Sequence, residues 1–310
     1  MAPALGLIGL VKQTVKDFLE DDCMDAAAAL SYYTIFSLPA ILVLLLTLIS
    51  VVMNPTDVRG GLESQLQTMM GPNAGEQIRT IIQQAQNKPH GGFLPTILGF
   101  AGLLFGATGA FGQLQKTLNR TWNVEPDPNQ GGFKSFITKR LFSFGMILVV
   151  AFFLLVSLVI SAALTGMSGR LGSVLPSGLS GPLLEIFNTI VSLAVITALF
   201  AALFKVMPDA KIHWGNVWVG AAVTAVLFVV GKFLIGFYLG KSNPGQAYGA
   251  AGSLAVLLLW VYYSSLILLF GAEFTETWAE QRGKGIEPEP GAVMVRREKQ
   301  RVGELSSQTR

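Results

Sequence analysis

The sequence contains little from which a catalytic or metal centre could be built. Its 310 residues include one cysteine, Cys23, and two histidines, His90 and His213. A single cysteine excludes a disulfide within the chain and any paired-cysteine metal site, so we expect Cys23 to be a small buried side chain. Asp209 and His213 are four residues apart, but Pro208 and the short loop around them disfavour a metal site. We predict that the protein binds no metal.

Charged residues and nucleotide-binding motifs are also scarce. Only 13% of the residues are charged, and the net charge is +3. The sequence has no GxxxxGK[ST] phosphate-binding loop, no acid–base set at a shared depth, and no stripe of lysine and arginine on a soluble face. We therefore predict that the protein is not an enzyme, needs no cofactor and has no nucleic-acid partner.

Long apolar runs dominate instead, because 51% of the residues are hydrophobic. A run of about 20 apolar residues crosses the roughly 30 Å of hydrocarbon in a bilayer. The sequence predicts an all-α, polytopic membrane protein with six transmembrane helices, at about residues 26–53, 91–115, 141–169, 186–204, 214–239 and 247–272. Glu273 and Glu276 follow the sixth span, and we expect them to lie among lipid headgroups.

Three segments lie outside these spans. Residues 1–25 form a cytoplasmic arm with an amphipathic helix, which we expect to lie flat on the membrane surface or, alternatively, to pack on the bundle. Helical spacing on both sides of a central break predicts a short external hairpin over residues 56–88. Residues 281–310 are charged and lack apolar periodicity, which predicts a disordered cytoplasmic tail.

The distribution of lysine and arginine predicts the orientation. Sixteen of them lie in the N-terminal arm, in the loops after the second and fourth spans, and in the tail, whereas five lie in the other loops. Because cytoplasmic loops carry the excess of positive charge, we expect both termini in the cytoplasm.

Lys232 is the only charged residue within the six spans. An ammonium at the bilayer centre costs about 2.5–3.5 kcal/mol, so the lysine either reaches toward the headgroups, pairs structurally, or contacts a substrate or ion. Gly236 and Gly240 follow at four-residue intervals, and we expect this face to meet protein rather than lipid. The sequence leaves these roles open.

Pro39 interrupts the first span and is a predicted hinge, because proline removes a backbone donor from a helix. Residues beside it could form part of a binding surface, although plain helix packing explains them equally well. The predicted substrate-binding set is Lys232, Tyr32, Tyr33, Ser37, Tyr238 and Tyr262. Gly102 and Gly106 form a further predicted packing stripe, either within one chain or in a homo-oligomer.

Several ordered motifs carry a resemblance to a known family. They are AAALSYYTIFSLP at 27–39, GATGAFGQLQKTLNRTWNV from Gly106, PDAKIHWGNVWVGA from Pro208, GKFLIGFYLG from Gly231 and YGAAGSL from Tyr248. In order and spacing the chain resembles the YihY/virulence factor BrkB family over about residues 10–280. The resemblance implies a multi-pass protein of the bacterial inner membrane, linked in some members to virulence. Some members have carried a ribonuclease BN label, which these residues do not support.

Two functions of different kinds remain. The first is transport, or flipping between leaflets, of an anionic lipid or another amphiphile, because a glycine-rich bundle with one interior lysine could attract an anionic headgroup. The alternative is a non-transporting scaffold that recruits envelope proteins through the external hairpin and the tail. A tRNA-processing ribonuclease has the least support. In each case the expected partners are membrane lipids.

Overall fold

The computed structural model describes residues 6–49, 60, 93–128, 141, 144–153, 156, 180–242, 252–282 and 285–295. Its main helices are α1 (Leu7–Glu20), α2 (Cys23–Ile49), α5 (Phe93–Thr121), α7 (Ser180–Val206), α8 (Trp214–Ser242) and α10 (Gly252–Gln281). Its strands are β1 (Val124–Pro126), β2 (Ala210–Lys211), β3 (Glu287–Pro288) and β4 (Ala292–Met294).

The long helices follow the apolar runs from which they were predicted. Four are long and apolar enough to cross a membrane, over Cys23–Leu45, Thr189–Val206, Trp214–Tyr238 and Leu254–Gln281. Helix α5 covers the predicted second span, and the shorter apolar helix Phe144–Phe153 lies within the predicted third span. The structure is thus consistent with an all-α membrane protein. The number of six spans and the cytoplasmic termini stay predictions, and the predicted hairpin over 56–88 lies outside the described residues except for Gly60.

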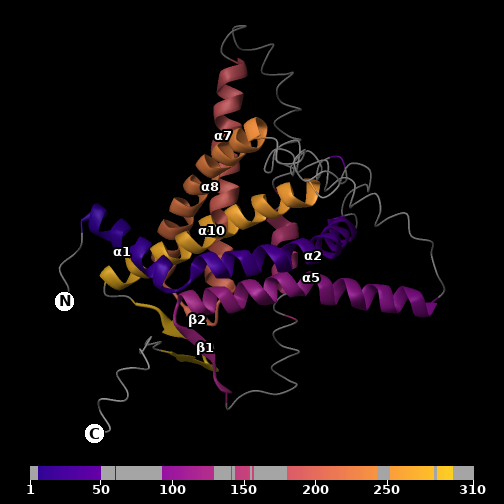
Figure 1. The fold of residues 1–310 in the computed structure, drawn as a ribbon, viewed down its shortest axis with the longest axis horizontal. Coiled ribbons are helices and arrows are strands. Elements are labelled where there is room, and N and C mark those ends of the chain that lie inside the picture. Colours follow the sequence, from indigo (N-terminus) through magenta and orange to yellow (C-terminus); the bar gives the residue numbers. More distant parts are fainter. Residues whose placement is uncertain are drawn as a thin grey trace.

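The helices share one core. Figure 1 shows α2, α5 and α10 side by side, with α7 and α8 rising away from them. Helix α2 packs on α5 and α10, and α8 packs on α7 and α10. The beginning of α2 and the C-terminal ends of α5, α7 and α10 converge at one end, joined by contacts between Cys23 and Glu273, Asn119 and Asp209, and Trp122 and Ala272. We call this the polar end, comprising residues 21–23, 119–127, 206–213, 273–281 and 285–295.

Helices α8 and α10 meet at a reciprocal pair of glycine and threonine residues. A Cβ atom added at Gly220 would overlap Thr275 Oγ1, and one added at Gly271 would overlap Thr224 Oγ1. Each hydroxyl donates a hydrogen bond within its own helix, from Thr224 Oγ1 to the Gly220 carbonyl at 2.7 Å and from Thr275 Oγ1 to the Gly271 carbonyl at 2.6 Å. The hydroxyls are therefore satisfied without a partner across the interface, and the two backbones approach closely.

Helix α10 extends beyond the sixth span predicted over 247–272, since it continues to Gln281. The prediction that Glu273 lies among headgroups is wrong, because its side chain is fully buried in the protein. The additional turns contact Asp17 of α1 through Thr277 and Asn123 through Glu276, and Ala279 is buried there. Protein encloses Glu273, whereas Glu276 is partly exposed, and its place among headgroups stays a prediction.

Helix α1 packs against α10, so the packing alternative for the amphipathic arm is confirmed. Its buried residues are Leu10, Thr14 and Phe18, which recur every four residues and form a narrow stripe. The ring centroid of Phe18 lies 6.0 Å from that of Phe270 on α10. Contact of α1 with the membrane surface stays a prediction.

The prediction of a disordered tail over 281–310 is wrong for its first part. Strand β4 pairs antiparallel with β1, with Met294 opposite Val124, and β3 pairs with β2, with Pro288 opposite Ala210. A tight turn joins β3 to β4, in which the Ala292 amide donates to the Glu289 carbonyl at 2.9 Å and Gly291 has φ 96°. Pro290 and Gly291 are the residues that favour such a turn, and partner strands from distant loops supply the remaining hydrogen bonds.

Candidate functional site, an acidic cavity at the polar end

A cavity of about 500 Å³ opens where α1 meets the C-terminal end of α10. Helix α1 contributes one wall and α10 the opposite wall, while the turn after α5 and the end of β4 complete the lining. The lining residues are Gln13, Asp17, Glu20, Asp21, Asn123, Glu276, Glu280, Met294 and Val295. Five of these carry carboxyl groups, and none is a lysine, arginine or histidine.

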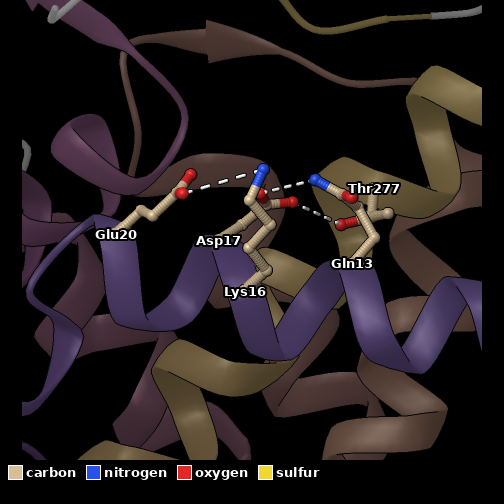
Figure 2. Close-up of polar contacts among 5 residues, drawn as sticks. All are labelled: Gln13, Lys16, Asp17, Glu20 and Thr277. Atoms are coloured by element: carbon tan, nitrogen blue, oxygen red, sulfur yellow. Dashed lines mark hydrogen bonds and ion pairs between the residues drawn. The ribbon is translucent and has the colours of Figure 1, made fainter.

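The two walls are linked by polar contacts around Asp17 (Figure 2). Gln13 Nε2 donates to Asp17 Oδ1 at 2.7 Å, and Thr277 Oγ1 of α10 lies 3.5 Å from Asp17 Oδ2. Lys16 Nζ lies 3.7 Å from Glu20 Oε1, and both side chains are well exposed. Exposed pairs of this kind contribute little, at most about 1 kcal/mol. The contacts that orient the Asp17 carboxyl group are those with Gln13 and Thr277.

Burial raises the pKa of Asp17 above the ordinary value of 3.8, and the negative charge of Glu20 raises it further. The hydrogen bonds from Gln13 and Thr277 and the charge of Lys16 oppose this shift. A carboxyl group whose pKa is higher in the folded state favours folding most when it is protonated.

We expect the free energy of unfolding to fall as the pH rises from 3.8 through the folded-state pKa of Asp17. Asp17→Asn should weaken this dependence, because asparagine does not titrate. The measurement is thermal unfolding of the detergent-solubilised protein at about pH 5 and about pH 7. The exposed Asp25 provides the control, Asp25→Asn. An Asp17→Asn protein with an unchanged pH dependence would contradict the assignment.

One turn before the lining residue Glu276, α10 carries a fully buried carboxyl group. Glu273 is 0% exposed, and its Oε1 accepts a hydrogen bond from Cys23 Sγ at 3.2 Å. The expectation that Cys23 is a small buried side chain is confirmed, and the thiol also has a polar role. This contact joins the first residue of α2 to α10.

A second polar network fixes the end of α5. Gln115 Nε2 and Asn119 Nδ2 donate to the two carboxylate oxygens of Asp209 at 3.0 and 2.8 Å. The Asp209 amide donates to Asn119 Oδ1 at 2.8 Å, and the Glu289 amide donates to the Asp209 carbonyl at 3.0 Å. The network therefore ties the α7–α8 loop to both α5 and the tail. These contacts give Asp209 a structural role.

The chemistry of the cavity is that of an electronegative recess. Its clustered carboxyl groups favour cations and ammonium groups over anions. Within the described ranges, no three His, Cys, Asp or Glu side chains come close enough to hold a metal ion. The carboxyl groups instead line opposite walls.

The structure places the predicted residues of α2 apart from this cavity. Tyr32 and Tyr33 are exposed, with ring centroids 5.8 Å apart in an edge-to-face arrangement. Ser37 is buried, and a Cβ atom added at Gly109 of α5 would lie 3.3 Å from its hydroxyl. Pro39 is an exposed position within α2, which continues to Ile49. Its role as a hinge stays a prediction.

The other predicted residues lie on α8 and α10. Lys232 is half-buried, and its Nζ lies 5.4 Å from the ring centroid of Phe233. Tyr238 is exposed, and Tyr262 is partly buried against the main core. None of the six predicted substrate-binding residues lines the acidic cavity. Their role in binding stays a prediction.

The predicted packing glycines have different surroundings. A Cβ atom added at Gly106 would lie 3.2 Å from Ala40 of α2, whereas one added at Gly102 or Gly236 would have no neighbour within 4 Å among the residues that the structure describes. The surroundings of Gly240 lie outside the described residues. Near Lys232, α8 contacts α10 at Gly231, where an added Cβ atom would lie 2.6 Å from Ile267. This face is offset from the one that carries Gly236.

The sequence carries a local signal for the cavity, in the spacing of its acidic residues. Gln13, Asp17 and Glu20 share one face of α1, and Glu276 and Glu280 share one face of α10. Acidic residues on one face of two helices do not show which helices meet, because that depends on contacts between residues more than 250 positions apart. The cavity therefore depends on the docking of α1 on α10, which the sequence alone does not specify.

Comparison with known proteins identifies a membrane-protein family. The family described as virulence factor BrkB matches residues 14–294, which is most of the chain. No solved structure matches the chain.

Individual relatives are distant but extensive matches. A UPF0761 membrane protein of Pseudomonas aeruginosa strain LESB58 is 28% identical over 82% of this chain, and the match spans 59% of the relative's length. A UPF0761 membrane protein of Alteromonas mediterranea is 29% identical over 84% of each chain. The protein YfkH of Bacillus subtilis, whose name describes it as ribonuclease-like, is 26% identical over 86% of this chain and 94% of its own length.

Proposed function

Since the chain belongs to the virulence factor BrkB family, whose relatives include UPF0761 membrane proteins, we propose that it is a multi-pass bacterial inner-membrane protein that transports or flips an amphiphile. The substrate class is an anionic lipid or another amphiphile with an anionic group. The proposal assigns no enzymatic activity and no nucleic-acid partner.

One observation supports this proposal above the others: Lys232 is half-buried on α8, inside the apolar candidate span Trp214–Tyr238. It lies about 27 Å along α8 from Trp214, close to the thickness of the hydrocarbon. Lys232 is the group that would attract an anionic headgroup. The acidic cavity lies at the opposite end of α8, and its carboxyl groups would not hold an anion, so it is not part of this proposal.

We expect Lys232→Met to slow lipid movement about tenfold or more, because a contact to a charged group is worth about 1.5–3 kcal/mol. The measurement is the rate at which a fluorescent anionic phospholipid changes leaflets in liposomes that contain the protein. Lys232→Arg should retain the rate, and Lys211→Met, at an exposed position on β2, is the matched control.

Two results would remove the proposal. The first is the absence of any acceleration over protein-free liposomes across anionic and zwitterionic lipids. The second is full activity of Lys232→Met, which would mean that the lysine only reaches toward headgroups about 9 Å away at the end of its span.

A scaffold is the second candidate, and strands β3 and β4 at the beginning of the tail favour it. Strands β3 and β4 place the exposed side chains of Val293 and Met294 at the polar end. In a scaffold, Lys232→Met would be tolerated, whereas deletion of residues 56–88 or 281–310 would abolish function. Deletion of 296–310 alone would keep β3 and β4 and would separate the role of the strands from that of the remaining tail.

The name of YfkH makes RNA cleavage a third outcome to be measured. The purified protein would have to cleave tRNA with an activity that follows it through every purification step. An activity that separates from the protein would reject this role.

A further inference from the structure

Helix α1 has three faces, of which one packs on α10 and one lines the acidic cavity. Leu10, Thr14 and Phe18 are buried against α10. Gln13, Asp17 and Glu20 line the acidic cavity. The third face is apolar and exposed to a degree unusual for aliphatic side chains, reaching 86% at Ile8. It consists of Leu7, Ile8, Val11, Val15 and Leu19, and we call it the outer face of α1.

Two lysines border the outer face. Lys12 and Lys16 are exposed and follow Ile8, Val15 and Leu19 around the helix. Lys16 also lies 3.7 Å from Glu20, in a pair whose side chains are 61% and 63% exposed, so its ammonium remains accessible to other anions. An apolar face with lysines at its edge is typical of a helix that lies in the plane of a membrane surface.

The chain also places α1 close to the bilayer. Helix α1 ends at Glu20, and the candidate span Cys23–Leu45 begins after the two-residue turn of Asp21 and Asp22. Because α2 enters the membrane there, α1 cannot be more than a short distance from the same surface. Figure 1 shows α1 beside the beginning of α2 and the end of α10.

We propose that the outer face of α1 binds the membrane surface, with its aliphatic side chains among the headgroups and with Lys12 and Lys16 against anionic phosphates. A lipid surface fits this face better than a protein partner does. Protein interfaces are enriched in aromatic residues and depleted in lysine, whereas the outer face is aliphatic and its border is basic. Lysine side chains can extend their charged ends toward phosphates while their stems cover apolar surface.

This arrangement connects the lipid surface with the acidic cavity. The same helix presents its outer face to lipid and its acidic face to the recess that Glu276 and Glu280 line. Membrane binding would hold α1 against α10 although acidic side chains face each other across the cavity. The inference does not depend on transport, because α1 would bind lipid in the same way in a scaffold.

The test places a nitroxide label at single introduced cysteines in the full-length protein. Ile8→Cys reports the outer face, and Glu20→Cys is the matched control on the cavity face. The protein is reconstituted in phosphatidylcholine vesicles with and without phosphatidylglycerol. Collisions with oxygen, which concentrates in lipid, are compared with collisions with a water-soluble nickel chelate. Unaltered protein measures background labelling of the buried Cys23.

We expect the label at residue 8 to be protected from the nickel chelate and accessible to oxygen, and the label at residue 20 to show the reverse. Phosphatidylglycerol should increase the protection at residue 8, and Lys12→Gln with Lys16→Gln should remove that increase. A label at residue 8 that stays accessible to water in both kinds of vesicle would overturn the proposal. Equal protection with and without phosphatidylglycerol would overturn the proposed contact of Lys12 and Lys16 with anionic phosphates. The transport assay is separate, so either inference can fail alone.

Discussion

Gly271→Ala is expected to destabilise the protein by about 1–3 kcal/mol or more, because a methyl group there has no space. The added Cβ atom would overlap Thr224 Oγ1 and lie 2.8 Å from Thr224 Cβ, an atom that cannot move without the α8 backbone. Gly220→Ala should have the same effect, since the Thr275 Cβ is also 2.8 Å from the added atom. Helices α8 and α10 would have to separate. The measurement is thermal unfolding and the yield of monodisperse protein in detergent.

The chain provides a matched control within α8. Gly236→Ala adds the same methyl group where no atom of the described residues lies within 4 Å, and it should be neutral or slightly stabilising, by up to about 1 kcal/mol. Gly271→Ala combined with Thr224→Ala should recover part of the loss, because the overlapping hydroxyl is removed but the Cβ contact remains. If Gly271→Ala and Gly236→Ala unfold alike, the close crossing of α8 and α10 is contradicted.

Trp122→Ala is expected to cost about 3–5 kcal/mol, the usual loss for a buried aromatic residue. The indole is 0% exposed, and its Nε1 donates to the Ala272 carbonyl at 3.1 Å. Its ring centroid also lies 6.1 Å from that of Phe204 at the end of α7. The variant would therefore remove a contact among α5, α7 and α10 and leave a cavity at the polar end. The measurement is the shift in thermal unfolding temperature, with proteolysis of the polar end as a second readout.

Two further variants separate the causes of this loss. Trp122→Phe keeps much of the aromatic packing and removes the hydrogen bond, so it should cost less than Trp122→Ala, although it leaves the Ala272 carbonyl without this donor. Trp218→Ala removes an indole that is 47% exposed on α8, and it should be milder still. Equal destabilisation by Trp218→Ala and Trp122→Ala would show that burial at the polar end is not the source of the effect.

The long apolar helices could be predicted because their signal is local. A stretch such as 214–239 must be helical in a bilayer, since each backbone polar group needs a partner within the segment. The first five residues of the described tail segment, 285–289, have no such signal, and their hydrogen bonds come from strands far away in the sequence. The Pro290–Gly291 turn was a local signal, but a turn alone does not form a strand pair. The tail therefore could not be predicted from its charge and composition.

The packing faces show the same limit. Four-residue spacing placed Lys232 and Gly236 on one face of α8, whereas the described contacts with α10 use Gly220, Thr224 and Gly231. Both sets contain small residues at helical spacing. Only the partner helix, through Thr275, Tyr263 and Ile267, distinguishes them.

The sequence by itself determined that this is a helical membrane protein, where its apolar helices run, and that α1 is amphipathic. Apolar length and helical periodicity act within one segment and need no partner. The tertiary structure alone decided that α1 docks on α10, that the tail adds strands to the polar end, and that acidic side chains enclose a cavity there. These features depend on contacts between distant segments, and a residue's own neighbours in the chain do not specify them.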